Sequence, residues 1–229
     1  MIIEPRFRGP PGSGNGGYSC GVLGITFPGP AEVTLRVPPP LGKELRVERK
    51  GDKALLMDGE AVVAEGAPAT LELEPPAPVS FDEAVKASRG YPWHTGHPYP
   101  TCFVCGPQRG EGDGLRIFPG AVEGRKAAAA PWVPDPSLAS ESGAVRPEIM
   151  WAALDCPGWY GFMCFHEWSG MVLLGRLAAR IDRLARAGER CVAAGWFLGR
   201  EGRKIHTGSA LFSGGELLAL GKSTWIALR

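Results

Sequence analysis

The sequence predicts an α+β fold in which antiparallel strands predominate and which consists of two similar halves. Three observations favour this class. The chain holds 33 glycines and 22 prolines among 229 residues, so turn-forming residues interrupt it at short intervals. Most of its apolar stretches are short and contain β-branched residues, which is typical of strands. A weak internal repeat relates the two ends of the chain.

The first predicted helix follows a glycine-rich stretch near the N-terminus. Asn15 is a preferred N-cap residue, and an apolar run follows it. Gly17, Gly21 and Gly24 lie three or four residues apart, so they would share one face of that helix. Each glycine costs about 0.8–1 kcal/mol relative to alanine in a helix. A helix with three of them is therefore expected to let another backbone approach closely.

The remainder of the N-terminal region is predicted to form strands, at residues 33–37, 45–50, 53–57, 61–65 and 69–73. Asp58-Gly59 between the third and fourth of these is a hairpin turn signal. Residues 75–112 differ because they are rich in proline, glycine and aromatic residues. Within them, Ser80 and Glu83 form a capping box for a short helix. We therefore expect an N-terminal half at 1–74, a linker at 75–112 and a C-terminal half at 113–229.

The C-terminal half is predicted to contain an apolar helix at 145–151, with Pro147 in its first turn. The expected strands are at 115–118, 127–133, 171–184, 189–199, 203–212 and 216–228. Residues 171–184 are ambiguous, because Leu173, Leu177 and Ile181 are spaced as in a helix. The internal repeat places this stretch opposite residues 33–37, and we therefore interpret it as a strand.

The repeat consists of two ungapped stretches with similar surroundings. Residues 62–73 align with residues 217–228, and each stretch follows a turn that ends in Gly-Glu. Earlier in each half, Leu35-Arg36-Val37 corresponds to Ala179-Arg180-Ile181. The identity is low, but the order of a helix followed by antiparallel strands is shared, so the repeat predicts two similar halves.

Charge and hydropathy limit the expected partners. Lysine and arginine number 25 against 24 acidic residues, which gives a net charge of +1. Proteins that bind nucleic acid or membrane surfaces usually carry a basic excess, so neither partner is expected. No apolar run reaches 18 residues, and the N-terminus lacks the apolar stretch of a secretory signal. These features predict a cytoplasmic protein.

Three segments together resemble a known family. They are Gly14-Asn15-Gly16-Gly17 at the first helix, HPYPTCFVCG at 97–106 and WAALDCPG at 151–158. In this combination the chain resembles the double hotdog of acyl-CoA thioesterase-like proteins, over nearly its whole length. The resemblance implies two antiparallel sheets, each wrapped around a central helix, and a substrate groove between the halves.

Thioester hydrolysis needs a polarised carbonyl and either an activated water or a carboxylate nucleophile. The amides of Gly16 and Gly17 at a helix N-terminus are candidate oxyanion donors, and Asn15 would orient the carbonyl or the water. Asp155 is the best candidate carboxylate, because it follows an apolar helical run and burial would raise its pKa. Glu148, in the first turn of that helix, is the second candidate.

Each candidate also has a purely structural interpretation. Asn15 could be a plain N-cap, Asp155 could end its helix through a turn, and Glu148 could interact only with the helix dipole. Thr207 and Ser209, on a predicted strand, could bind substrate or water, or they could be satisfied polar groups of the core or surface.

The linker holds four potential zinc ligands, His94, His97, Cys102 and Cys105, in the pattern H-x2-H-x4-C-x2-C. Only four residues, two of them prolines, separate the histidine pair from the cysteine pair, which makes wrapping one ion awkward. We therefore expect no metal and interpret the cysteines as a tight knuckle that holds the linker against the sheets. The remaining cysteines, Cys20, Cys156, Cys164 and Cys191, are expected to be small buried hydrophobic residues.

Two function classes follow from these observations. The first is a hydrolase of acyl-CoA or a related acyl thioester that needs no metal or organic cofactor. The second is a non-catalytic hotdog protein that binds an acyl group or another apolar ligand. A dehydratase ranks third, because the sequence has no convincing Asp–His pair. Exposed sheet edges usually need cover, so a homodimer is also expected.

Overall fold

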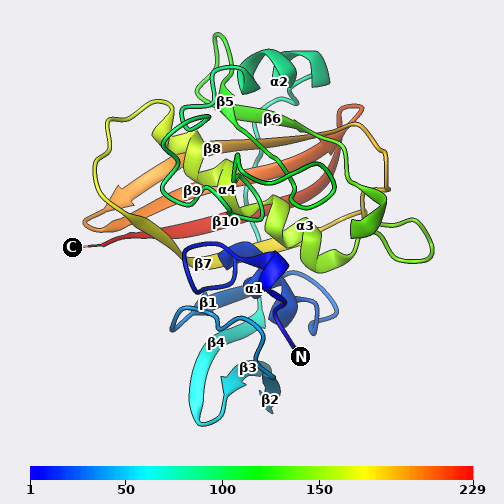
Figure 1. Cartoon of the computed structure of the whole chain (residues 1–229), viewed down its shortest axis with the longest axis vertical. Coiled ribbons are helices and arrows are strands. Elements are labelled where there is room, and N and C mark those ends of the chain that lie inside the picture. Colours follow the sequence, from blue (N-terminus) through cyan, green and yellow to red (C-terminus); the bar gives the residue numbers. More distant parts are fainter. Residues whose placement is uncertain (229) are drawn as a thin grey trace.

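The computed structural model describes residues 1–228 and contains one antiparallel sheet of ten strands that crosses the molecule (Figure 1). The strand order is β2-β3-β4-β1-β7-β10-β9-β8-β6-β5. The strands are β1 (Ala31–Leu35), β2 (Arg46–Lys50), β3 (Lys53–Asp58), β4 (Ala61–Pro68), β5 (Gly120–Ala121), β6 (Ala128–Trp132), β7 (Val172–Ile181), β8 (Cys191–Glu201), β9 (Lys204–Ser213) and β10 (Glu216–Ala227).

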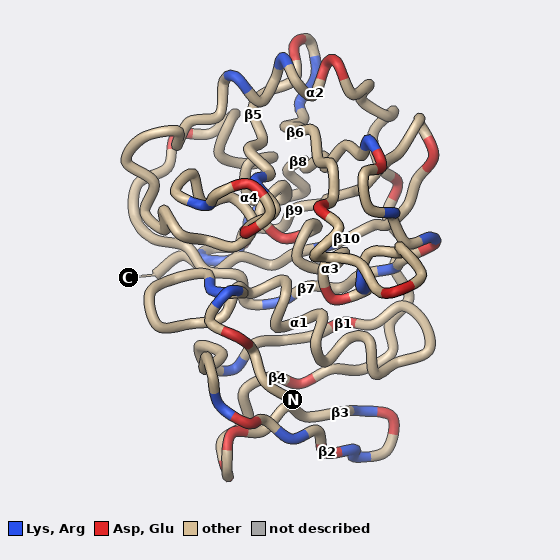
Figure 2. Tube along the Cα trace, turned by 45° about the vertical axis from the view of Figure 1, so that its right-hand side comes forward, with Lys and Arg blue, Asp and Glu red and all other residues tan. Residues whose placement is uncertain are grey.

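Four α-helices accompany the sheet within the described part of the chain, namely α1 (Gly16–Gly24), α2 (Phe81–Ser88), α3 (Pro147–Ala153) and α4 (Asp155–Met163). Short 3-10 turns lie at Pro5–Phe7 and Pro136–Leu138. Within residues 1–228, no helix has the length and apolar character needed to cross a membrane. In Figure 2, basic and acidic residues are interspersed, with uncharged stretches of the trace between them.

The sheet is continuous because β1 pairs with β7 across the middle of the molecule. Ala31 lies opposite Ala179, and Val33 lies opposite Leu177. The sequence predicted two sheets, and this edge pairing joins them into one. Pairing satisfies the backbone groups that both strands would otherwise leave open at an edge.

Helices α1, α3 and α4 enclose the main core on one face of the sheet. Helix α1 packs on β1, β4 and β7, and α4 packs on β8, β9 and β10. Side chains alternate between the two faces of a strand. Leu211 accordingly belongs to this core, whereas its neighbours Ala210 and Phe212 belong to a second cluster on the opposite face.

The second cluster is covered by the linker. Leu71, Val79 and the buried alanines of α2 pack there against Trp196 and Phe212. In Figure 1, α2 lies at the top of the molecule beside β5 and β6. The Ser80 side chain accepts a hydrogen bond from Glu83 N–H, and the Glu83 carboxylate accepts one from Ser80 N–H, so the expected capping box is present. The linker thus covers apolar surface that the sheet would otherwise expose.

Two predicted strands are not strands in the structure. Residues 69–73 form no ladder, because they leave the sheet at Ala69, whose N–H donates to Pro30 O, and run toward two prolines that lack a donor. Residues 115–118 form no strand, because Arg116 has a left-handed backbone with φ 53°, and their amides bond to a loop instead. Leu115 N–H donates to Phe103 O and Ile117 N–H donates to Val104 O. In contrast, residues 172–181 form the strand that the repeat predicted, in spite of their helical spacing.

Three of the four glycines of α1, Gly17, Gly21 and Gly24, form a bare face against α3, as expected from their spacing. A Cβ atom added at Gly21 would lie 2.7 Å from Cβ of Trp151 and 2.9 Å from Cα of Glu148. At Gly17, an added Cβ would lie 2.5 Å from Cβ of Asp155. The missing side chains therefore allow α1 and α3 to approach closely.

This packing predicts that Gly21→Ala destabilises the protein. Overpacking against backbone typically costs about 1–3 kcal/mol, and the gain in helix propensity of about 1 kcal/mol offsets part of it. The difference is a net loss of up to about 2 kcal/mol in the free energy of unfolding, and the contact with α3 backbone places Gly21→Ala toward the upper end of this range; urea denaturation measures it. Gly29→Ala is the matched control, because an added Cβ there meets nothing within 4 Å. Equal stability of both variants would contradict the close packing.

Candidate active site

A cavity of about 560 Å³ opens beside the N-terminal ends of α1 and α4. This volume suits a small-molecule ligand. Its walls are largely apolar and come from α4, β7, β10 and the linker. They include Trp93, Trp159, Met163, Trp168, Val172, Leu174 and Trp225. The polar residues of interest on its lining are Asn15, Cys102, Cys105, Asp155 and Cys156.

Asn15 and Asp155, which are far apart in the sequence, are hydrogen-bonded in this wall. The Asn15 amide Nδ2 donates to Oδ2 of Asp155 at 2.8 Å, and the Gly17 N–H donates to the same oxygen at 2.9 Å. Asp155 is only 3% exposed. Among residues 1–228, its second oxygen, Oδ1, has no hydrogen-bond partner. The carboxylate therefore has one engaged oxygen and one free oxygen.

Local structure explains why Asp155 lies at this point. Leu154 has helical backbone angles and joins α3 to α4, so Asp155 begins α4 rather than ending the preceding helix through a turn. The hydroxyl of Ser209 on β9 donates to Leu154 O at 2.7 Å and holds this joint against the sheet. A carboxylate in the first turn of a helix is stabilised by the helix dipole.

Burial raises the pKa of Asp155 to about 7. The hydrogen bond from Gly17 N–H and that from Asn15 oppose this rise, while the nearby Cys102 sulfur adds to it. Desolvation dominates because the charged form loses its hydration in the buried site. A carboxylate with such a pKa is a stronger base than an exposed aspartate.

Asn15 acts both as a helix cap and as a partner of the carboxylate. Its Oδ1 accepts a hydrogen bond from Tyr18 N–H at 2.9 Å, which is the N-cap role expected from the sequence. Its Nδ2 is left free to reach Asp155. The two interpretations of Asn15 are therefore compatible, because each uses a different end of the amide.

The structure separates the two glycine amides that the sequence grouped together. The N–H of Gly17 is engaged with Asp155, so it is not free to donate to a substrate oxygen. Gly16 lines the cavity, and its N–H lies in the first helical turn, where no intrahelical acceptor exists. The Gly16 amide is therefore the one of the two that remains a candidate donor to a substrate oxygen.

Three other candidates lie outside the cavity lining. Glu148 forms an ion pair with Arg146, with 3.6 Å between Nε and Oε1. Ser209 bonds to Leu154 as described, and the Thr207 hydroxyl oxygen accepts a hydrogen bond from Trp225 Nε1 at 2.9 Å. Both hydroxyls are fully buried between β9 and its neighbours. Both are engaged within the protein, Ser209 with Leu154 and Thr207 with Trp225, as in the alternative interpretation of satisfied polar groups.

The four linker residues with zinc-ligand spacing do not converge. His94 is exposed, and its Nε2 lies 3.2 Å from Ser88 O. Instead, the sulfurs of Cys102 and Cys105 meet Cys156 from α4, and all three lie within 4.8 Å of one another. The interpretation of Cys156 as an ordinary buried hydrophobic residue missed this cluster. Only its position directly after Asp155 could have associated it with the site.

The cysteine cluster is connected to the carboxylate. Asn15 Nδ2 also donates to Cys102 Sγ, at 3.9 Å. Hydrogen bonds from the Cys105 and Cys156 thiols, followed by those from backbone amides, lower the pKa of the Cys102 thiol, although burial opposes them.

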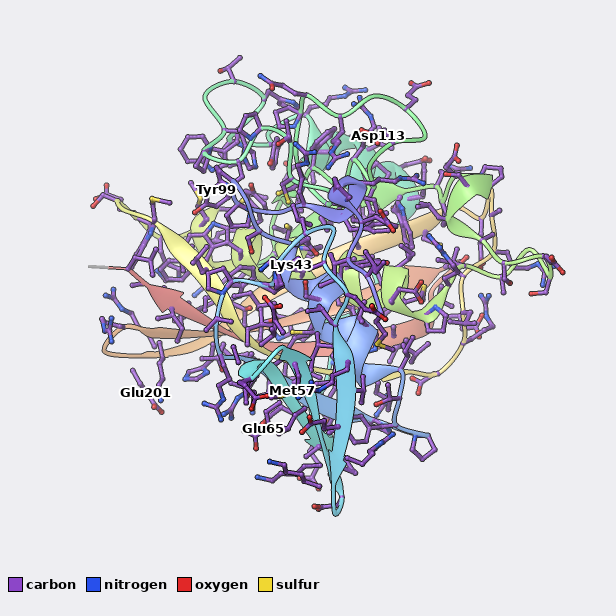
Figure 3. All side chains as sticks on the ribbon, turned by 60° about the horizontal axis from the view of Figure 1, so that its bottom comes forward. Lys43, Met57, Glu65, Tyr99, Asp113 and Glu201 are labelled. Atoms are coloured by element: carbon purple, nitrogen blue, oxygen red, sulfur yellow. The ribbon has the colours of Figure 1, made fainter. Side chains whose placement is uncertain are left out.

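The loop that carries Cys102 and Cys105 lies away from the first strands of the chain. In Figure 3, Tyr99 and Asp113, which flank this loop, lie on the opposite side of the molecule from Met57 and Glu65 of β3 and β4.

Comparisons with known proteins rest on structure alone. No model of a known protein family matches the sequence, and no curated protein matches it. A solved protein with a hot dog fold from Alicyclobacillus acidocaldarius has a TM-score of 0.59 at 11% identity, covering 100% of this chain and 92% of its own. A proposed thioesterase from Novosphingobium aromaticivorans has a TM-score of 0.59 at 14% identity, covering 100% and 94%.

A third similar structure is the tesB protein of Mycobacterium avium subspecies paratuberculosis. Its TM-score is 0.58 at 11% identity, and the match covers 96% of this chain and 89% of that protein. At such identities the similarity establishes the fold and leaves the activity to be argued from the site. Together with the large antiparallel sheet, it shows that this chain has a hotdog fold.

The geometry predicts that Asn15→Ala lowers the free energy of unfolding by more than the loss of an ordinary N-cap does. The variant loses an N-cap, worth about 0.5–2 kcal/mol, and leaves a buried carboxylate without one donor, worth about 1–3 kcal/mol. We expect a loss of about 2–4 kcal/mol in urea denaturation. Ser80→Ala, which removes only the exposed cap of α2, is the control. A loss no greater than that of the control would mean that the bond to Asp155 contributes little.

Proposed function

We propose that this protein hydrolyses an acyl thioester, such as an acyl-CoA, in the cavity beside Asp155. One observation carries the proposal: a buried carboxylate with a free oxygen lies in the wall of an apolar cavity, next to a side-chain amide and a helix N-terminus. The apolar walls suit an acyl chain. The hotdog fold, which several thioesterases share, supports the same activity.

The proposal includes two hotdog halves, residues 1–74 and 113–229, joined by the linker at 75–112. The equivalent strand pairings support it. Strand β1 pairs antiparallel with β4, and β7 pairs antiparallel with β10 in the same way. Helix α1 packs on the first pair and α4 lies against the second group. In this arrangement Asn15 and Asp155 face each other from the N-terminal ends of two equivalent helices.

In the proposed mechanism, the thioester carbonyl oxygen accepts a hydrogen bond from Gly16 N–H. Asp155 Oδ1 then either removes a proton from the attacking water or attacks the carbonyl carbon itself. Asn15 and Gly17 hold the carboxylate through Oδ2, which leaves the buried Oδ1 without a hydrogen-bond partner among residues 1–228, in a residue that lines the cavity. In the first route, the carrier thiolate leaves and takes up the proton that Asp155 removed from the water. In the second route, the thiolate leaves as an anhydride forms with Asp155; water then hydrolyses this anhydride, and one of its protons passes to the thiolate. A preorganised donor of this kind typically contributes about 10²–10³ in turnover.

A specific observation favours the alternative, a non-catalytic protein that binds an acyl or other apolar ligand. Asp155 Oδ2 accepts bonds from both Gly17 and Asn15, so the carboxylate also links α1 to α4. A residue whose task is to hold two helices together needs no reactive oxygen. In the hydrolase, Oδ1 of Asp155 takes part in catalysis, whereas in the binding protein it does not.

Asp155→Asn distinguishes them. The variant preserves side-chain shape and an oxygen acceptor for Gly17, so we expect it to fold. Loss of a general base typically lowers turnover about 10²–10⁴-fold. Hydrolysis of acyl-CoA esters of varied chain length, followed by the released thiol, measures the effect. Glu148→Gln is the control, because Glu148 lies outside the cavity lining and should leave hydrolysis unchanged.

Each outcome of this experiment leads to a different conclusion about Asp155. A folded variant that hydrolyses at the wild-type rate rules out the catalytic role of Asp155. Wild-type protein that hydrolyses no ester, yet is stabilised against heat by a long-chain acyl-CoA or fatty acid, supports the binding protein. A variant that unfolds shows the carboxylate to be chiefly a link between helices.

The expected homodimer is retained as a prediction, although the sheet edges themselves do not demand it. Edge strand β2 carries a charge at every residue except Val47, and the other edge strand, β5, has two residues. Charged and short edge strands resist further pairing. A dimer would thus use another surface. Light scattering should give about twice the chain mass of 24.3 kDa, and a value near 24.3 kDa would contradict it.

A further inference from the structure

Three buried thiols meet where the linker reaches α4. Cys102 and Cys105 are each 4% exposed and Cys156 is 8% exposed. Their sulfurs lie within 4.8 Å of one another, and all three residues line the cavity. A thiol is a weak hydrogen-bonding group, so hydrogen bonds among three thiols contribute little to the stability of the fold. The proposed hydrolysis assigns no role to them.

The loop that carries two of these cysteines has the shape of a metal-binding knuckle. Gly106 N–H donates to Cys102 O at 2.9 Å, and an added Cβ at Gly106 would lie 2.5 Å from Cys102 N. Only glycine fits this turn. The turn brings Cys102 and Cys105 together, and their sulfurs lie within 4.8 Å of each other and of the Cys156 sulfur.

His97 is a supporting group in this arrangement. Its Nδ1 accepts a hydrogen bond from Tyr99 N–H at 2.8 Å, which assigns the ring proton to Nε2. That nitrogen lies 3.4 Å from Cys105 Sγ and 3.3 Å from the Tyr160 hydroxyl. With its proton on Nε2, the ring donates to the sulfur and orients it rather than competing for a metal.

We propose that Cys102, Cys105 and Cys156 bind one zinc ion through their sulfurs, with the fourth coordination position directed into the cavity. Zinc–sulfur bonds of about 2.3 Å in a tetrahedral site place the sulfurs about 3.8 Å apart. The observed cluster needs only a small contraction to reach this geometry. Three soft ligands select zinc over magnesium or calcium. On binding, three zinc–sulfur bonds form and the thiol protons pass to solvent.

The site would join segments that are distant in the sequence. Cys102 and Cys105 belong to the linker, and Cys156 directly follows Asp155 on α4. Asn15 touches both the Cys102 sulfur and the Asp155 carboxylate. A zinc ion would therefore hold the linker to the helix that carries Asp155. The fourth position would accept a water molecule or another small oxygen, nitrogen or sulfur donor from the cavity.

Metal analysis of the whole purified chain tests the proposal directly. Protein produced with zinc in the medium and kept reduced should retain close to one zinc per chain after gel filtration. Cys105→Ala and Cys156→Ala should each retain less than a fifth of this amount. Cys191→Ala, a buried cysteine outside the cluster, is the matched control and should retain the full amount. Wild-type protein without zinc, or equal zinc in all four proteins, would overturn the proposal.

Cobalt substitution keeps the test valid if a cysteine variant fails to fold. Addition of Co²⁺ to metal-free, reduced wild-type protein should produce a sulfur-to-cobalt charge-transfer band that saturates at one equivalent. Absence of the band would overturn the site. The band should persist in His97→Ala, and added cyanide should shift the visible cobalt bands. Loss of the band in His97→Ala, or no response to cyanide, would overturn the open fourth position.

Discussion

The buried Asp155 carboxylate is the interaction on which the site depends. Its Oδ2 accepts hydrogen bonds from the Gly17 amide and the Asn15 side chain, and so connects the N-terminal ends of α1 and α4. A buried carboxylate is costly unless such donors compensate it. Here two donors compensate one oxygen, and the other oxygen is buried without a hydrogen-bond partner among residues 1–228. The proposed function assigns reactivity to this second oxygen, whereas the first links the two helices.

This arrangement requires close approach of the helices, which the glycines of α1 permit. A Cβ atom at Gly17 would overlap Asp155, and one at Gly21 would press on the backbone of α3. The helix propensity lost at these positions is recovered in the packing of α1 against α3 and β7. The pairing of β1 with β7 then sets the distance between the two helices, because both rest on the same continuous sheet.

The linker, residues 75–112, makes two kinds of contact with the rest of the protein. One part covers the outer face of the sheet through α2, and another carries the cysteine loop to α4. The proposed hydrolysis and the proposed zinc site share this wall of the cavity but rest on different atoms, a carboxylate oxygen in one and three sulfurs in the other. Each can therefore fail without the other.

The sequence alone determined the elements whose causes are local. The Asn15 cap, the Ser80–Glu83 capping box and the glycine face of α1 follow from residue chemistry within one turn of helix. The repeat correctly overrode the helical spacing of residues 172–181. Tertiary structure decided everything that joins distant segments: the bond between Asn15 and Asp155, the engagement of Gly17, and the meeting of Cys156 with Cys102 and Cys105. Spacing along a chain fixes neighbours within a helix or strand, whereas contacts between separate elements depend on how those elements pack.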